Sequence, residues 1–308
     1  MSKVTIVIVM YHYVRNMHET DYPDIKGLLI KNFKGQLDYL SRNYRFISIE
    51  DYVDFLYDNK EIPKNSCILT FDDGLKDHYV NVFPILKKKK IPGCFFPSTG
   101  PISTMKVLFV HKTHFLLAKL GGKKFSDKFN STVRRKAPEL LEKFFVSDKL
   151  NEKDIYHLDN PLTYNLKKNI AEMNTEEKTL ILDKIFDKYF ENKEDFCREL
   201  YMNWDEMREM LEEGMSFGAH TINHPELTSL DEKGQLKEIK EPKEILESEL
   251  KTKIISLSYP YGQFNDTTIK LLKKLKYKCA LIDRGTTNDG IVDPFKIERV
   301  DTIKLPFK

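Results

Sequence analysis

Two adjacent carboxylates, Asp72 and Asp73, are the residues of this chain with the clearest capacity for chemistry. They lie in the segment Thr70–Gly74 (TFDDG), directly after the apolar run Ser66–Leu69. Neighbouring strand residues point to opposite faces, so two acids at the end of a strand can serve different tasks in one cleft. Two like charges held side by side out of water are costly unless a cation lies between them. We therefore expect a metal ion here, with further ligands from the downstream segment His220–Pro225 (HTINHP).

The elements that must position these residues are predicted strands alternating with helices. Strands with that alternation are typical of a parallel sheet covered by helices. We therefore expect an α/β fold, specifically a distorted (β/α)7 barrel, whose active site would form at the carboxyl ends of the strands. The seven predicted strands are 4–11, 45–48, 66–71, 93–96, 216–219, 254–259 and 278–283.

One long stretch interrupts this alternation. Residues 101–201 show helical patterns without a convincing strand, and such a length is unusual for a structureless loop. We interpret the stretch as a helical insertion within a single domain of residues 1–308. An insertion on the carboxyl side of the strands would lie near the mouth of a barrel.

Three polar residues are predicted to cap helices at their amino ends. They are Asn32 for a helix over 32–43, Asp266 for a helix over 267–276, and Asp77 for the helix that follows the two acids. Asparagine and aspartate are preferred at this position because their side chains accept a hydrogen bond from a free backbone N–H.

As a group, these motifs resemble those of the polysaccharide deacetylases, carbohydrate esterase family 4. The residues concerned are Thr70–Gly74, His220–Pro225 and Tyr259–Gly262 (YPYG), in that order. The segment Met10–Val14 (MYHYV) resembles the permuted branch of the family. That branch includes the poly-β-1,6-N-acetylglucosamine deacetylases and carries its catalytic histidine on the first strand. The resemblance covers nearly the whole chain apart from the insertion.

The resemblance implies one divalent metal, with zinc expected, held by Asp73, His220 and His224. Two nitrogens and one oxygen leave metal positions open for water and substrate, although such a set accepts several divalent ions. The metal would lower the pKa of its water, and Asp72 would take the proton as general base. The alternatives are that the acids cap a turn, or that the histidines, four residues apart, share a helix face. Pro225 argues against that helix.

Two further catalytic roles follow from the resemblance. The backbone N–H of Tyr261 would stabilise the oxyanion, and His12 would protonate the departing amine, a role for which histidine side chains are suited. His12 could equally be a hydrogen-bonded core histidine, and residues 259–262 could be an ordinary turn.

The chain departs from the common family pattern at two places. Ser258 stands where an arginine commonly precedes the Pro-Tyr pair of the third motif, and no histidine follows His224. Membership of the permuted branch would account for the missing histidine. Arg299 could supply the missing guanidinium and orient Asp72, although a surface salt bridge would explain Arg299 equally well.

The remaining histidines carry no functional prediction. His111 and His114, three residues apart on a predicted helix, could bind a metal but are interpreted as surface residues. His18, His78 and His157 show no pattern that indicates a function.

The overall composition excludes several classes of protein. The 308 residues carry a net charge of +3 with both signs intermixed, which argues against a nucleic-acid binder. The four cysteines are scattered, so neither a disulfide framework nor a cysteine zinc site is predicted. No apolar run approaches the ~18 residues of a membrane span. The amino-terminal run is too short for a signal peptide, and we expect a soluble, cytoplasmic protein.

The sequence therefore predicts a metal-dependent hydrolase that removes N-acetyl groups from an amino sugar, an oligosaccharide or a glycan. One alternative keeps the metal but cleaves another non-peptide amide or a cyclic imide. The other is an inactive carbohydrate-binding barrel, against which the complete set of Asp72, Asp73, His220 and His224 argues. The identity of the sugar, its linkage and the oligomeric state are left open.

Overall fold

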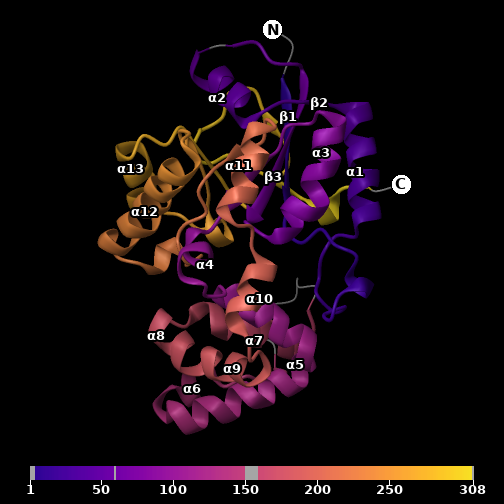
Figure 1. Ribbon diagram of the computed structural model, residues 1–308. Helices are drawn as coiled ribbons and strands as arrows, with labels where there is room; N and C mark the ends of the chain where they lie inside the picture. Colours follow the sequence, from indigo (N-terminus) through magenta and orange to yellow (C-terminus); the bar gives the residue numbers. More distant parts are fainter. Residues whose placement is uncertain (1–3, 59, 150–158, 307–308) are drawn as a thin grey trace. The chain divides into compact units, whose positions relative to one another are not determined.

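A computed structural model describes residues 4–58, 60–149 and 159–306 of the chain. The chain forms two compact units (Figure 1). The sheet unit comprises residues 1–16, 27–106 and 197–308. The helical unit comprises residues 17–26 and 107–196.

All seven predicted strands are confirmed, several of them in shortened form. The described residues form two additional strands, β8 and β9, of two residues each. The strands are β1 Thr5–Tyr11, β2 Arg45–Phe46, β3 Asn65–Asp73, β4 Cys94–Pro97, β5 Ser216–Phe217, β6 Ser256–Ser258, β7 Cys279–Leu281, β8 Asn288–Asp289 and β9 Val300–Asp301.

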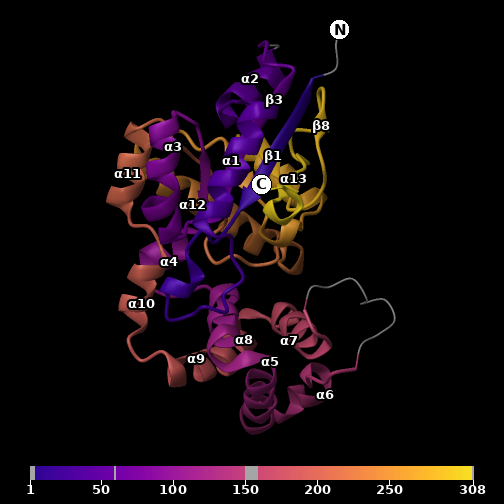
Figure 2. The same ribbon diagram turned by 90° about the vertical axis from the view of Figure 1, so that its right-hand side faces the viewer.

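The strands confirm an α/β fold with mainly parallel pairing. The larger sheet has the order β5-β4-β3-β1, with β2 beside β3 and β9 beside β1. Strand β8 runs antiparallel to β1 (Figure 2), which an all-parallel arrangement did not predict. The second sheet pairs β6 with β7. Isolated bridges Ala219–Leu257 and Leu281–Ile297 continue the pairing from β5 to β6, and from β7 to the segment that leads into β9.

The helices of the sheet unit begin at residues different from two of the predicted caps. Helix α1 has Leu29, not Asn32, at its N-cap, because Leu28 already bonds to Tyr13 and directs the chain into the helix. Asn265, not Asp266, caps the last helix by accepting from Thr268. The helices are α1 Ile30–Asn43, α2 Ile49–Asp58, α3 Phe83–Lys89, α4 Thr99–Thr104, α11 Trp204–Glu212, α12 Glu232–Leu250 and α13 Asp266–Lys274; α12 and α13 pack together (Figure 1).

The helical unit packs around its own aromatic core. Phe186 and Phe190 stack with ring centroids 4.2 Å apart, and Tyr22 meets Phe115 edge to face at 4.9 Å. Helix α5 is kinked at Gly121, which has a φ of 70°. The helices are α5 Phe109–Lys136, α6 Leu141–Phe144, α7 Pro161–Glu172, α8 Thr175–Lys178 and α9 Lys184–Tyr189, while α10 Lys193–Leu200 leads back into the sheet unit.

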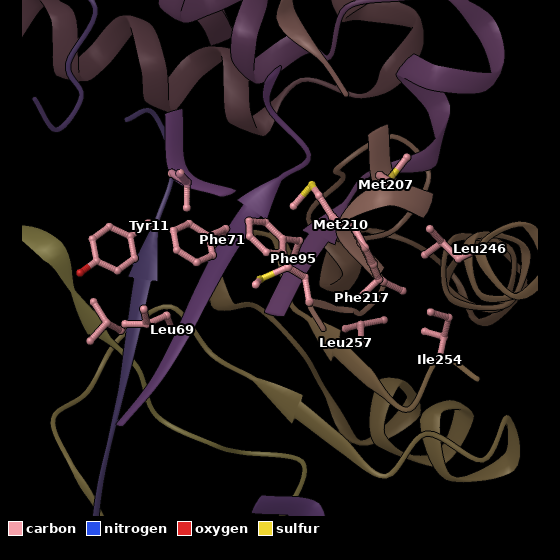
Figure 3. Packing of buried hydrophobic residues seen from close by; sticks show 14 of the residues in the cluster. Tyr11, Leu69, Phe71, Phe95, Met207, Met210, Phe217, Leu246, Ile254 and Leu257 are labelled. Carbon is pink, nitrogen blue, oxygen red and sulfur yellow. The ribbon is translucent and has the colours of Figure 1, made fainter. Parts of the chain in front are cut away.

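Three aromatic rings on adjacent strands fix the register of the sheet just below the predicted site (Figure 3). Tyr11 pairs with Phe71 and Phe71 with Phe95, and the rings stack at centroid distances of 5.1 and 4.7 Å. All three are fully buried. His12 directly follows Tyr11 and Asp72 directly follows Phe71, so the ring stack places these two residues at the same level of neighbouring strands.

Candidate active site

The two acids occupy the last residues of β3, where the backbone turns sharply. Asp73 has a φ of 76° and Gly74 one of 69°. A Cβ on Gly74 would lie 2.7 Å from the Cβ of Pro97, so only glycine allows the chain to pass this close to β4. The turn separates the directions of Asp72 and Asp73, although both side chains stay buried.

His220 and His224 lie on a loop after β5, not on a helix. The helix-face alternative is therefore wrong, because Thr221 and His224 adopt positive φ angles of 62° and 55°. The hydroxyl of Ser98 donates to the carbonyl of His220 at 2.7 Å and anchors the start of the loop.

Glu238 of α12 holds the middle of that loop, a role that the sequence did not indicate. One carboxylate oxygen accepts the backbone N–H of Ile222 at 2.8 Å and that of Asn223 at 3.0 Å, and the other accepts the Asn223 amide. Glu238 lies on the buried face of α12, together with Gln235 and Ile239.

Asp73, His220 and His224 converge as a possible metal centre. Asp73 Oδ1 lies 3.4 Å from His220 Nε2 and 3.5 Å from His224 Nε2, and the three ligand atoms all lie within 4.8 Å of one another. Tetrahedral zinc with bonds of about 2.0–2.2 Å would hold its ligand atoms roughly 3.3–3.6 Å apart. This is the one such cluster of three among the residues that the structure describes.

The hydrogen bonding of His220 also fits a metal ligand. Its Nδ1 donates to the carbonyl of Ser258 at 2.8 Å, so the neutral ring would direct the lone pair of Nε2 toward Asp73. That buried Nε2 makes no hydrogen bond within the described part of the chain. Burial alone would lower the pKa of His220, but the carboxylates of Asp72 and Asp73 outweigh it and raise the pKa. The same negative charge would attract a cation.

Asp72 forms a buried bidentate ion pair with Arg299. Arg299 Nη1 donates to Asp72 Oδ1 at 2.9 Å and Nη2 to Oδ2 at 2.7 Å. The guanidinium is fully buried, so the surface salt-bridge alternative is wrong. Burial would raise the pKa of Asp72, but the charge and hydrogen bonds of Arg299 hold it well below its usual range. Asp72 is therefore a fixed, ionised carboxylate.

Ser258 joins this pair where the common family pattern has an arginine. Its hydroxyl accepts from Arg299 Nη2 at 2.8 Å and donates to Asp72 Oδ2 at 2.9 Å. Arg299 Nε donates to the carbonyl of Ile282 just after β7. A guanidinium from the end of the chain thus reaches Asp72, with Ser258 filling the space beside it.

His12 follows β1, and its side chain is partly exposed. Burial raises the pKa of Asp72, whereas Arg299, His220 and, more weakly, His12 act to lower it. The backbone of residues 12–15, the His12 segment, is bonded to the side chains of Asp77 and His78. Asp77 was expected to cap a helix, and no role was expected for His78. Asp77 stands at the N-cap position of the π-helical turn His78–Val82, but its side chain makes no capping hydrogen bond there. Its carboxylate instead accepts from the Val14 N–H at 3.0 Å, and the buried His78 bonds to the carbonyl of His12.

Tyr261 lies on a tight turn after β6, next to a metal-ligand candidate. It has a φ of 56°, and its ring meets that of His224 edge to face at a centroid distance of 4.8 Å. Its backbone N–H donates no hydrogen bond to any residue in the described ranges. The turn therefore lies next to His224.

His111 and His114 lie on helix α5 of the helical unit. His111, predicted at the surface, is fully buried in the helical unit, because its helix supplies core residues on that face. His157 lies outside the described residues. None of the described helices has the length and apolar character needed to cross a membrane.

Comparison with known proteins gives matches to a single family model and to several relatives. The family model described as polysaccharide deacetylase matches residues 59–133 and 164–280. The putative polysaccharide deacetylase YxkH of Bacillus subtilis is 30% identical over 90 residues, which are 29% of this chain and 31% of that protein. The poly-β-1,6-N-acetyl-D-glucosamine N-deacetylase of Staphylococcus aureus is 38% identical over 73 residues, 23% of this chain and 24% of that protein. The matches thus span less than a third of these curated relatives.

Solved structures share the fold over nearly the whole chain. The Streptococcus pyogenes deacetylase PplD in complex with acetate superposes with a TM-score of 0.62 and 20% identity, covering 97% of this chain and 93% of that one. IcaB from Ammonifex degensii gives a TM-score of 0.59 and 19% identity, covering 96% and 91%. At these identities the likeness concerns the fold alone.

Proposed function

The chain belongs to the polysaccharide deacetylase family, and we propose that it is a metal-dependent hydrolase that removes N-acetyl groups from an amino sugar or glycan. The observation that carries this proposal is the convergence of Asp73, His220 and His224, with ligand atoms within 4.8 Å, beside the Asp72–Arg299 pair. A binding module would have no need of a buried, charge-compensated carboxylate next to a metal centre.

We infer that Asp73, His220 and His224 hold one divalent metal, with zinc as the expected ion. When bound, the metal would lower the pKa of a water molecule and polarise the acetyl carbonyl. The buried Nε2 of His220, with its lone pair set by the Ser258 carbonyl, supports this assignment. An oriented outer hydrogen bond of this kind is usual for metal-bound histidine.

Asp72 is proposed as the general base. Its two oxygens are held by Arg299 and Ser258, so the carboxylate is ionised and cannot rotate freely. It would accept the proton of the attacking water at one oxygen while the ion pair fixes its orientation. General bases positioned in this way contribute about 10²–10⁴-fold to a rate.

Tyr261 and His12 are proposed to serve the two later demands of the reaction. The Tyr261 N–H would donate to the oxyanion as the carbonyl carbon becomes tetrahedral. The His12 imidazolium would give its proton to the sugar nitrogen, so that the amine leaves as the C–N bond breaks. The pairing of Tyr11 with Phe71 supports a place for His12 beside Asp72.

We also infer that the sheet unit is a distorted (β/α)7 barrel within a single domain that carries the helical unit as an insertion. The support is the pairing path from β5 through Ala219–Leu257 to β6, and from β7 through Leu281–Ile297 toward β9 and β1. The proposed metal ligands, base, oxyanion donor and proton donor lie at the carboxyl ends of strands or in the loops that follow them.

The test is acetate release from N-acetylated sugars by the metal-loaded protein. Candidate substrates are chito-oligosaccharides, β-1,6-linked N-acetylglucosamine oligomers, and lipid-linked or nucleotide-linked amino sugars. Chelation should stop acetate release, and re-addition of Zn²⁺ should restore it. Bound metal without acetate release would favour cleavage of another amide or a cyclic imide. Absence of both would favour a carbohydrate-binding barrel.

A further inference from the structure

We propose that His78 is a positioning residue that holds His12 in the active site by bonding to its carbonyl, assisted by Asp77 and Asn81. This inference rests on the proposed function, because that function makes His12 the proton donor. It adds a reason why a histidine beyond the end of a strand can have a fixed orientation.

The contacts come from one short stretch of chain. His78 Nε2 lies 3.0 Å from the carbonyl oxygen of His12. Asp77 Oδ2 accepts from the Val14 N–H at 3.0 Å and from Arg15 Nε at 2.7 Å. Asn81 Nδ2 donates to the carbonyl of Val14 at 2.8 Å. Three side chains within five residues thus bond to the segment that carries His12.

The turn that presents these side chains is π-helical over His78–Val82, with Phe83 N–H bonded to the carbonyl of His78. Single π turns within helices are rare and occur frequently at functional sites. The wider turn changes the direction of the side chains that follow, and it directs both His78 and Asn81 at the same segment.

The chemistry of His78 suits a rigid donor. A carbonyl oxygen only accepts, so Nε2 must carry the proton. The other ring nitrogen, Nδ1, is buried and makes no hydrogen bond within the described residues. The ring also packs against Phe71 at 5.5 Å and Phe95 at 5.8 Å. His78 therefore connects the aromatic stack below the site to the backbone of His12.

The His12 segment needs such support because regular pairing ends just before it. Tyr11 is the last residue of β1 to pair with β3. The backbone of Tyr13 and Arg15 forms hydrogen bonds with the backbone of Leu28. The side chains of Asp77, His78 and Asn81 supply the remaining contacts that hold the segment in place. A general acid must lie within hydrogen-bond reach of its target, and a displacement of about 1 Å can cost about 10²-fold in rate.

The decisive variant is His78→Phe, which keeps a ring in the aromatic stack and removes the donor. We expect kcat for an N-acetyl sugar to fall about 10- to 100-fold, with KM and bound metal unchanged. An activated acetate ester, whose leaving group needs little protonation, should be affected far less. In a His12→Ala background the added His78→Phe change should have no further effect, because its consequence acts through His12.

A matched control is Tyr277→Phe, which removes one buried hydrogen bond, from the Tyr277 hydroxyl to the Ile239 carbonyl at 2.9 Å, in the same unit. It should leave kcat and the amide-to-ester ratio unchanged. If His78→Phe does not fold, Asn81→Ala tests the same segment, with a smaller loss of the same leaving-group dependence. A folded His78→Phe protein whose ratio of amide to ester kcat equals that of the wild type would overturn the proposal. So would a double variant, His12→Ala with His78→Phe, whose loss of kcat equals the product of the two single losses.

A measurement independent of catalysis separates this inference from the proposed function. Side-chain ¹H–¹⁵N spectra of the eight histidines, assigned with His12→Ala, should show a shifted or broadened His12 signal in His78→Phe and an unchanged one in Tyr277→Phe. An unchanged His12 signal in His78→Phe would overturn the positioning role. A shifted signal in a protein that releases no acetate would support the positioning and overturn the proposed function alone.

Discussion

Arg299, from the last segment of the chain, holds Asp72 at the end of β3 through two parallel hydrogen bonds of 2.9 and 2.7 Å. The two residues are 227 positions apart in sequence, and neither side chain is exposed to solvent by more than 2%. A planar guanidinium matches both oxygens of a carboxylate, which a lysine ammonium does not. The pair therefore sets both the charge and the orientation of the proposed base.

Removal of the Arg299 guanidinium should destabilise the fold and alter the pH profile. In Arg299→Met an unpaired charge remains buried, which typically costs about 3–5 kcal/mol in the free energy of unfolding. Because the guanidinium holds the pKa of Asp72 low, its loss should move the acidic limb of kcat/KM to higher pH. Urea unfolding and a pH–rate profile measure these effects.

Two comparisons make that test specific. Arg208→Met removes an arginine that is 41% exposed in its ion pairs with Asp205 and Glu249, and exposed pairs contribute at most about 1 kcal/mol. The double variant Asp72→Asn/Arg299→Met should recover stability relative to Arg299→Met, because no buried charge is left alone. Equal losses for Arg299→Met and Arg208→Met would contradict the role of the buried pair.

Loss of a proposed ligand should remove the metal and the activity together. We expect His224→Ala to lower the metal content of the purified protein, measured by elemental analysis, in proportion to its acetate release. His18→Ala, an exposed histidine of the helical unit, is the control and should retain both. Full metal content in the Asp73, His220 and His224 variants alike would rule out this ligand set.

The two neighbouring acids should respond differently to the same substitution. Asp72→Asn should abolish turnover while the metal stays bound, because a base is lost and not a ligand. Asp73→Asn should weaken metal binding, because the oxygen that lies 3.4 and 3.5 Å from the two histidines loses its charge. Metal titration alongside acetate release distinguishes them, and the opposite pattern would exchange the two roles.

His12→Ala should slow amide hydrolysis far more than ester hydrolysis. Expulsion of an amine is slow unless its nitrogen is protonated, and a general acid contributes about 10²–10⁴-fold. We expect kcat for an acetamide to fall within that range, while an activated ester is nearly unaffected. Acetamide turnover close to that of the wild type would assign the proton donor to another group or to water.

The buried His78 should make the protein less stable in acid. Burial lowers the pKa of His78 from 6.5 to about 4, so between these values the unfolded chain binds a proton that the folded protein resists. Stability should therefore fall as pH is lowered through that window, by up to about 3 kcal/mol from this group. In His78→Phe that part of the slope should vanish, as urea unfolding from pH 7 to pH 4 would measure. An unchanged slope would contradict the burial of a neutral imidazole.

Local sequence information was sufficient to predict the strands and to propose a ligand set. Short apolar runs and the positions of Asp72, Asp73, His220 and His224 after them predicted seven strands and a ligand set, since both depend on neighbouring residues. The stacked rings of Tyr11 and Phe71 belong to runs of this kind.

Only the tertiary structure decided which distant groups complete the site. Arg299 lies beside a two-residue strand, and Glu238 accepts hydrogen bonds from the histidine loop. Asp77, which was expected to cap a helix, and His78, for which no role was expected, both bond to the His12 segment. These contacts join residues far apart in the chain, so no periodicity or short spacing records them. Each depends on how the strands and helices pack, because a buried polar group takes its role from the partner that packing brings within hydrogen-bond distance.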